Sequence, residues 1–306
     1  MSSELESEWR RMTDAFAMHL RLEKAMATNS VEAYLNDLSH LRGYALEHNL
    51  SPLDITADDM QQLLAEMQET GIASKSQSRM ISGWRMFYNM LVVEDELSDN
   101  PAKQVLLPLC PKHLPDVLTD DDVSAIQATF DRSKPDQDRN YVIVEVLYGC
   151  GLRVSELVSM RLSNIYVDEE CLLIMGKGSK ERWVPINHRA LRLLSDYISL
   201  TRSHIEPKPG EEKYVFLNRR GSHLTRNYVF MFLQQAARNA GIEKHVSPHS
   251  LRHSFATELV QNGADLRAVQ EMLGHAKLST TEIYTHLDAK YLRTTIENYH
   301  PHYREK

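Results

Sequence analysis

The sequence predicts a mostly helical α+β protein built from two domains, and three observations support this fold class. Through residues 1–100, apolar side chains recur three and four positions apart, which is the spacing of one helix face. Four prolines then fall between residues 101 and 115, where they deny a helix its backbone donors. Beyond them the helical pattern returns, interrupted by two short β-prone segments around "GKGSK".

The first domain is expected at 1–100 as a four-helix bundle. Its helices are predicted at 7–26, 30–49, 56–71 and 74–96. Thr56 and Asp59 form a capping box at the start of the third helix. The fourth helix has an apolar stripe, made of Ile81, Trp84, Phe87, Tyr88 and Leu91.

The opposite side of this fourth helix is basic. Lys75, Arg79 and Arg85, with Ser82 between them, recur near helical spacing. Such a ridge is either a solvated helix face or a surface that contacts DNA phosphates. Residues 101–117 are then predicted to be an extended linker, and the second domain to occupy 118–306.

Composition favours a cytoplasmic globular protein without membrane insertion. The chain of 306 residues has three cysteines without CxxC spacing, a polar amino-terminus and no apolar run of the roughly 20 residues that a membrane helix needs. The net charge of −7 argues by itself against nucleic acid. It is unevenly distributed, however: residues 1–110 carry 9 basic and 17 acidic side chains, whereas 176–226 carry 11 basic and 5 acidic ones. A locally basic surface is therefore compatible with the composition.

The second domain opens with another capping box, Thr119–Asp122, and continues into an apolar helix that Gly149 and Gly151 interrupt. Arg153 lies at the junction with the next helix. It is either a structural arginine paired with Glu156 or part of a site.

A β-hairpin is predicted next, with Lys177 between two glycines at its tip. A turn lysine is most often only solubilising. The GxxxxGK[ST] spacing of a Walker A loop is absent, so the motif does not indicate ATP binding.

A strongly marked helix begins at Pro248, with Ser247 as its cap and Gly263 beyond its end. His249 and Arg252 lie three positions apart at its amino-terminal end. Helix starts favour anions, because their N–H groups are free and the dipole is positive there.

The stretch "LGHAKLSTTEIYTH" at 273–286 follows a predicted helix at 265–273 that ends at Gly274. Ser279 and Glu282 form an S-x-x-E box, so a short helix is expected to begin there and to carry Tyr284. His275 and Tyr284 are, taken alone, either packing residues or members of a site.

Six polar side chains stand out at helix starts and turn tips: Arg153, Lys177, His249, Arg252, His275 and Tyr284. Guanidiniums clamp phosphate oxygens, imidazoles move protons near neutral pH, and a lysine can protonate a leaving alkoxide. A tyrosine supplies an oxygen nucleophile. Together these groups would suit phosphoryl transfer without a metal ion.

In order, the segments "GLRVSEL", "GKGSKER-VPI", "HSLRHSFAT" and "LGHAKLSTTEIYTH" resemble the signature boxes of the tyrosine recombinases, the lambda-integrase family. The resemblance covers nearly the full chain, and within the family it is strongest to the XerC/XerD chromosome-dimer resolvases. It assigns the family's catalytic roles to the six residues without substitution, with Tyr284 as the nucleophile.

The resemblance implies a core-binding helical domain and a catalytic domain that clamp double-stranded DNA, four protomers acting on paired sites as a homo- or hetero-tetramer. Strands would be exchanged through a 3′-phosphotyrosyl link and a Holliday junction, with no cofactor, metal or ATP. The carboxy-terminal tail would dock on a neighbouring protomer. A sister recombinase and a septal DNA translocase of the FtsK type would be partners, and neither they nor the DNA sequence can be read from the chain.

Three other interpretations compete with this resemblance. His249 and His253 are spaced like zinc ligands on one helix face, although the glutamate of HExxH is missing, which leaves a zinc hydrolase as a remote alternative. A DNA-binding protein without activity is disfavoured by the intact Tyr284. An integrase or transposase of a phage or mobile element would use the same chemistry, and the motifs do not separate it from a resolvase.

Overall fold

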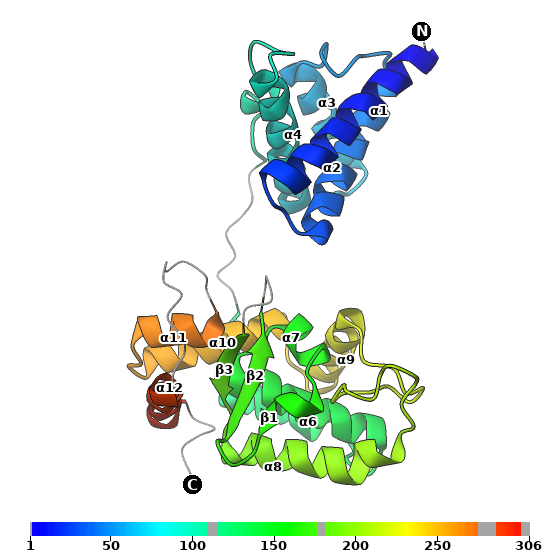
Figure 1. Ribbon diagram of the computed structural model, residues 1–306. Coiled ribbons are helices and arrows are strands. Elements are labelled where there is room, and N and C mark those ends of the chain that lie inside the picture. The colour runs from blue at the N-terminus through cyan, green and yellow to red at the C-terminus, as the bar shows by residue number, and fades with distance from the viewer. Residues whose placement is uncertain (1, 109–115, 177–180, 275–285, 301–306) are drawn as a thin grey trace. The chain divides into compact units, whose positions relative to one another are not determined.

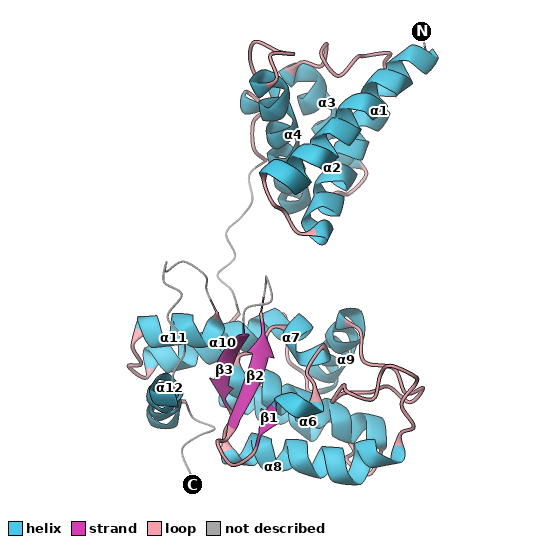
Figure 2. Cartoon of the chain, viewed as in Figure 1, coloured by secondary structure: helices cyan, strands magenta, loops and turns pink. Residues whose placement is uncertain are grey.

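The computed structural model describes residues 2–108, 116–176, 181–274 and 286–300, except the side chains of residues 2, 286–291 and 293. Two compact units, Met1–His113 and Leu114–Lys306, divide the chain. Each is described by itself (Figure 1). As predicted, the protein is mostly helical with one small antiparallel sheet (Figure 2).

The first unit is a helical bundle, as the apolar periodicity predicts. Its helices are α1 (Ser2–Met18, extended by a π turn at His19–Glu23), α2 (Thr28–Glu47), α3 (Ala57–Glu69) and α4 (Ser74–Val93). The largest buried side chains of its core are aromatic, namely Trp9, Phe16, Trp84, Phe87 and Tyr88. The capping box at Thr56 and Asp59 is present, and the apolar stripe predicted for α4 is buried.

The start of the segment predicted as an extended linker is folded. Asn100 caps a 3₁₀ helix at Pro101–Lys103, where its side-chain oxygen accepts a hydrogen bond from the Ala102 amide at 2.9 Å. Ala102 and Val105 are buried in the core of the first unit. This turn therefore packs with the bundle, because its small and apolar side chains fill the core beside α4.

The second unit contains eight helices among its described residues: α5 (Asp120–Ala128), α6 (Pro135–Cys150), α7 (Val154–Val158), α8 (His188–Asp196), α9 (Arg226–Asn239), α10 (Pro248–Gln261), α11 (Leu266–Leu273) and α12 (His286–Tyr299). Short turns of other helix types occur at Leu162–Asn164, Tyr197–Thr201 and Arg202–His204. Helix α9 was not predicted. Its buried residues, Val229, Leu233, Ala236 and Ala237, nevertheless have helical spacing.

The sheet has the order β1 (Ile165–Tyr166), β2 (Cys171–Met175) and β3 (Glu181–Pro185), all antiparallel. The β2–β3 pair confirms the hairpin predicted around "GKGSK". Ile174 lies opposite Arg182 in the register, so this arginine is near the hairpin end of β3.

Helix α6 is the centre of the second unit and is buried on most of its faces. It ends at Gly151, which has the left-handed φ of 60°. A Cβ atom there would lie 2.4 Å from the Phe255 ring of α10, so only glycine allows this close approach. The tight contact places Gly151 against α10, and Arg153 follows two residues later in the chain.

Helix α12 packs on its own unit in this single chain. Leu292 and Ile296 join a small core with Phe255 and Leu259 of α10 and Met272 of α11. His300 is fully buried between the rings of Tyr148 and Phe255, each with its centroid 5.1 Å from that of His300. The predicted docking of the tail on a neighbouring protomer stays a prediction about an assembly.

Across the described parts of the chain, no helix combines the length and the apolar character needed to cross a membrane.

Candidate active site

Glu156 is the centre of a buried cluster of charged side chains. It lies in the first turn of α7, which Arg153 precedes as the N-cap residue. The Glu156 carboxylate accepts hydrogen bonds from the Arg153 backbone N–H at 2.8 Å and from its guanidinium Nη1 at 2.9 Å. The pairing that the sequence left open as one alternative for Arg153 is therefore present, and it orients an arginine whose side chain stays 37% exposed.

A second arginine, Arg182 of β3, binds the other side of the same carboxylate. Its Nη1 and Nη2 donate to Oε1 and Oε2 of Glu156 at 2.7 and 2.9 Å. This is the bidentate geometry that a guanidinium and a carboxylate favour. Arg182 was not among the predicted site residues. The only signal in the sequence was that it occupies an alternating, core-facing position of β3 next to Val184.

Arg252 of α10 completes the cluster and is buried. Its Nη1 donates to the Gly151 carbonyl at 2.6 Å and lies 3.9 Å from Oε2 of Glu156, and its Nη2 donates to the Leu273 carbonyl. Arg153 and Arg252, 99 positions apart in the chain, thus meet at one carboxylate.

The carboxy-terminal end of α11 docks on these three arginines. The carbonyls of Met272, Leu273 and Gly274 accept hydrogen bonds from Arg182, Arg252 and Arg153 respectively. A helix carboxy-terminus has free carbonyls and a negative dipole end, so it favours cations. Gly274, at φ 65°, ends α11 in the left-handed conformation, as predicted.

The charges of the cluster shift the pKa values of its members. Burial alone would raise the pKa of Glu156, but the hydrogen bonds and charge of Arg182, together with Arg153, outweigh it and lower that pKa. Burial, the charge of Arg153 and the charge of Arg182 lower the pKa of Arg252 to about 10, against the attraction of Glu156. Three guanidiniums against one carboxylate leave two positive charges in excess, which favours an anionic ligand.

His249 lies one turn before Arg252, in the first turn of α10, and is exposed. The predicted cap is present, since Ser247 accepts a hydrogen bond from the Ser250 amide at 3.1 Å. His249 and Arg252 thus follow each other along the same helix, with the arginine buried and the histidine accessible to a ligand.

Lys177, His275 and Tyr284 lie outside the described residues, as does the helix start predicted at Ser279. Gly274, the residue before His275, contacts the cluster through Arg153 and Arg182, and Arg182 belongs to the strand that follows the Lys177 loop. The assignment of these three residues to the site therefore rests on the sequence.

The basic ridge of α4 has contacts of its own. Arg79 pairs with the buried carboxylate of Asp37, and its side chain stays 50% exposed. Arg85 donates to the carbonyls of Ala102 and Val105 at 3.0 and 3.1 Å, while Lys75 is exposed. Arg85 therefore has a structural role, which the sequence did not reveal, whereas Lys75 and Arg79 present cations to solvent.

No group of three potential metal ligands among histidine, cysteine, aspartate and glutamate occurs in the described part of the chain. His249 and His253 thus have no third described ligand near them, so the geometry gives the zinc-hydrolase alternative no support.

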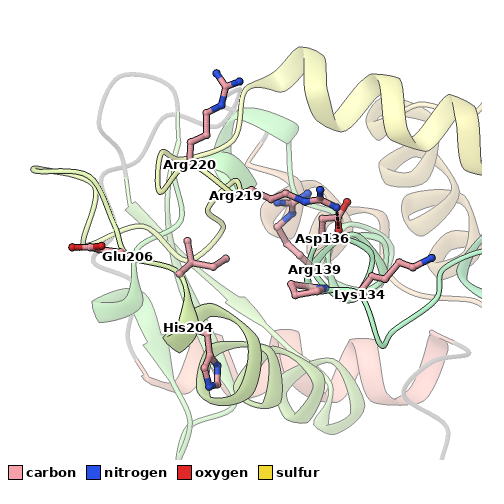
Figure 3. Close-up of a pocket in the computed structure, with 9 residues that line it drawn as sticks. Lys134, Asp136, Arg139, His204, Glu206, Arg219 and Arg220 are labelled. Atoms are coloured by element: carbon pink, nitrogen blue, oxygen red, sulfur yellow. Dashed lines mark hydrogen bonds and ion pairs between the residues drawn. The ribbon is translucent and has the colours of Figure 1, made fainter.

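A hollow of about 490 Å³ at the amino-terminal end of α6 is separate from the cluster (Figure 3). Arg219 in its wall is held by Asp136 at 2.6 Å. Arg139 donates to the Leu217 carbonyl at 2.9 Å and to Tyr228 at 2.5 Å. These two cations are occupied by partners within the protein. None of the described candidate residues lines this hollow.

Comparison with protein families gives two matches. Residues 116–290 match the phage integrase family, and residues 13–95 match the phage integrase N-terminal SAM-like domain. Together the two matched regions cover most of both units.

Comparison with individual proteins agrees with these matches. The chain is 37% identical to tyrosine recombinase XerD of Staphylococcus aureus over 289 residues, which are 94% of this chain and 98% of that protein. It is 35% identical to tyrosine recombinase XerD of Chlorobaculum tepidum over 301 residues, 97% and 99% of the two chains. Among solved structures, XerH recombinase bound to its difH substrate before cleavage is similar with a TM-score of 0.65 and 25% identity, over 96% of this chain and 83% of that one.

Proposed function

The chain belongs to the phage integrase family of tyrosine recombinases and is a site-specific recombinase, and from this premise we propose that it resolves chromosome dimers by cutting and rejoining DNA at Tyr284. The DNA-bound state of the similar XerH structure supports DNA as the substrate. The relatives named XerD, similar over nearly their full lengths, favour a resolvase above a mobile-element integrase.

One observation carries the chemical part of this proposal, namely the convergence of Arg153 and Arg252 on Glu156 beside the end of α11. A phosphodiester has one negative charge, and attack by a phenolate adds a second at the pentacoordinate stage. The cluster's excess of two positive charges would balance that charge without a metal ion. Its carboxylate keeps the arginines oriented before DNA arrives, so little reorganisation is required during reaction.

In the first step, the phenol oxygen of Tyr284 attacks the scissile phosphorus. The phosphorus bond to the 5′ oxygen breaks, leaving a 3′-phosphotyrosyl ester and a free 5′ hydroxyl. Arg153 and Arg252 bind the non-bridging oxygens. Lys177 gives a proton to the departing 5′ oxygen, and His249 and His275 share the removal and return of the phenol proton.

In the second step, the 5′ hydroxyl of a partner strand attacks the phosphotyrosine and releases Tyr284. The ester conserves the bond energy, so no ATP is consumed. Exchange of one strand pair gives a Holliday junction, and exchange of the other resolves it. Four protomers on two double-stranded sites are required, either four copies of this chain or two with a sister recombinase. A septal DNA translocase of the FtsK type would activate the second exchange.

The domain boundaries proposed from the sequence fit this function. Residues 1–100 would be the core-binding domain, with Lys75 and Arg79 of the basic ridge toward DNA while Arg85 holds the 3₁₀ turn. Residues 118–306 would be the catalytic domain with its docking tail. The linker at 101–117 would then begin with the 3₁₀ turn that packs on the bundle.

The test is to recover DNA that is covalently bound to the protein in cells and to sequence it. We expect one chromosomal site, with the 3′ end at the junction attached to Tyr284. The Tyr284→Phe variant should yield no covalent DNA while it still occupies the same site in a crosslinking assay. Covalent DNA from the phenylalanine variant would refute Tyr284 as the nucleophile, and sites confined to a mobile element would refute dimer resolution.

A further inference from the structure

Arg182 is an arginine on the core-facing side of a β-strand. It is 6% exposed, although its neighbour Glu181 on the same strand is exposed. A buried guanidinium is stable only when its donors are satisfied. Nε, Nη1 and Nη2 of Arg182 all donate, at 3.0, 2.7 and 2.9 Å, to Met272 and to Glu156. A conventional apolar residue would fill this position of a strand at lower desolvation cost.

The two acceptors of Arg182 both belong to the proposed site. The Glu156 carboxylate is shared between Arg182 and Arg153. Its Oε1 accepts a hydrogen bond from each guanidinium, and its Oε2 accepts one from the Arg182 guanidinium and one from the Arg153 backbone N–H. Met272 lies in the last turn of α11, just before Gly274. In addition, a Cβ atom on Gly274 would lie 3.3 Å from the Arg182 guanidinium, so the arginine packs directly under this turn.

We propose that Arg182 is a positioning residue of the recombination reaction, which holds Arg153 through Glu156 and holds the end of α11 through Met272. This inference rests on the proposed function. Every nitrogen of the Arg182 guanidinium already donates to Glu156 or Met272, so this side chain is committed to the protein and does not bind the phosphate. Its effect on the reaction is therefore transmitted through the two groups that it binds.

Among the three arginines of the cluster, only Arg182 lies on the hairpin strand. Arg153 is the N-cap residue of α7 and Arg252 belongs to α10. The hairpin that carries Lys177 is thereby connected to Glu156 and α11 by hydrogen bonds from a single guanidinium. A lysine offers one charge without the fork geometry, so it cannot make both connections at once.

The test uses the DNA site recovered above, in single-turnover cleavage at saturating DNA. Arg182→Lys and Arg182→Gln should each slow cleavage by about 10²-fold, the size expected when a reacting group is misplaced. The control is Arg202→Lys. Arg202 is also buried and donates to carbonyls, those of Tyr214 and Glu212, but lies outside the cluster. The Arg202→Lys variant should cleave within about threefold of the wild-type rate.

A second readout distinguishes positioning from loss of folded protein. Sulfur in place of one non-bridging oxygen of the scissile phosphate slows cleavage where a guanidinium donates to that oxygen. The sulfur effect is the ratio of the cleavage rate of the oxygen substrate to that of the sulfur substrate. For one of the two stereoisomers this ratio should fall toward one in Arg153→Lys, and it should fall for the same stereoisomer in the Arg182 variants. The ratio does not depend on the fraction of enzyme that is active. The double variant of Arg153→Lys and Arg182→Lys should be slower than Arg153→Lys alone by less than the Arg182→Lys factor, because the route through Glu156 is already lost and only the route through Met272 remains.

Unchanged sulfur effects, or losses that add in the double variant, would overturn the positioning role. Failure of both Arg182 variants to fold would also overturn it and make Arg182 a residue of folding alone. If the wild-type chain forms no covalent complex on any recovered site, the proposed function itself fails. If the wild-type chain forms the covalent complex and the Arg182 variants cleave as fast as the Arg202→Lys control, only the positioning role of Arg182 fails.

Discussion

Both units of the chain bind a buried carboxylate with arginine. In the bundle, Asp37 of α2 pairs with Arg79 of α4. In the second unit, Glu156 of α7 is surrounded by Arg153, Arg182 and Arg252. The first pair is balanced in charge, whereas the second group has two positive charges in excess.

This difference separates an ion pair that connects helices from one that prepares a site. Burial raises the pKa of Asp37 despite the charge of Arg79. The pKa of Glu156 is instead lowered, because several hydrogen-bond donors outweigh the burial. Glu156 neutralises only one of its three arginines, so positive charge remains there to bind a phosphate. The single Asp37–Arg79 pair has no net charge, so it attracts an anion much less.

The largest expected effect contrasts Arg252 with Arg79. Arg252→Met should lower the single-turnover cleavage rate at saturating DNA by about 10³-fold, because a charged donor to the transition state is lost. Arg79→Met should weaken DNA binding while the cleavage rate at saturation is retained. Gel-based cleavage over a range of DNA concentrations measures both quantities. A loss of saturated cleavage in Arg79→Met equal to that of Arg252→Met would remove the distinction.

The next contrast concerns stability. Glu156→Gln should lower the free energy of unfolding by about 3 kcal/mol, because it leaves buried arginines without a counter-charge. Asp37→Asn should cost about 1 kcal/mol or less, since Arg79 can turn its charge to solvent. Hydrogen exchange read by mass spectrometry reports on each unit separately. Equal losses of unfolding free energy in the two variants would show that the stability does not depend on how many arginines surround the carboxylate.

Acidification should change the stabilising contributions of Glu156 and Asp37 in opposite directions. The lowered pKa of Glu156 means that its stabilising contribution is complete at neutral pH and is lost as pH falls below the ordinary glutamate pKa and through the lowered folded-state pKa. The raised pKa of Asp37 means that its contribution is present in acid and is lost as pH rises through the folded-state pKa. Protection in the second unit should therefore decrease first on acidification. Glu156→Gln should reduce this acid dependence, to which Asp122, Asp136 and Glu211 also contribute through their lowered pKa values.

The sequence was sufficient for features that depend on neighbours in the chain. The caps at Thr56, Thr119 and Ser247 and the end of α11 at Gly274 were all predicted, because their hydrogen bonds span only a few residues. Arg153 and Arg252 were predicted because they belong to recognisable motifs. In the structure these two arginines lie at the same carboxylate, Glu156, and their roles in catalysis stay a prediction.

Features that depend on distant partners were not predicted. Arg182 follows "GKGSKE" and has the character of a solvated strand residue, since Glu156 is 26 positions away and Met272 is 90. Likewise, the role of Arg85 depends on carbonyls 17 and 20 positions later, in a segment whose prolines indicated extended chain. In both cases a charged side chain donates its hydrogen bonds to groups that are distant in the sequence and that only the folded chain brings close.

A smaller effect tests what the cluster cannot supply. Its arginines donate to Glu156 and to backbone carbonyls, so the leaving oxygen needs a proton from another group. Lys177→Ala should slow cleavage by about 10²-fold, and a substrate with a 5′-thiol leaving group, which needs no protonation, should restore the rate. Rescue should fail for Arg252→Met, whose defect is charge. A Lys177→Ala enzyme that the thiol does not rescue would exclude Lys177 as the acid.

The smallest effect concerns the basic ridge on the bundle, where Lys75 gives the clearest test. Reversal of Arg79 or Arg85 would also disturb Asp37 or the 3₁₀ turn, whereas Lys75 is exposed in the first turn of α4. A cation near a helix amino-terminus is unfavourable for the helix itself, so stability does not account for it.

If Lys75 contacts a phosphate, Lys75→Gln should reduce the slope of log K against log salt by about 1. Lys24→Gln, at an exposed position after the π turn that extends α1, is the matched control and should leave the slope as it is. Fluorescence anisotropy across a salt series gives both slopes. A slope unchanged by Lys75→Gln would place the DNA-facing side of the bundle elsewhere, and the balanced Asp37–Arg79 pair would then have a purely structural role.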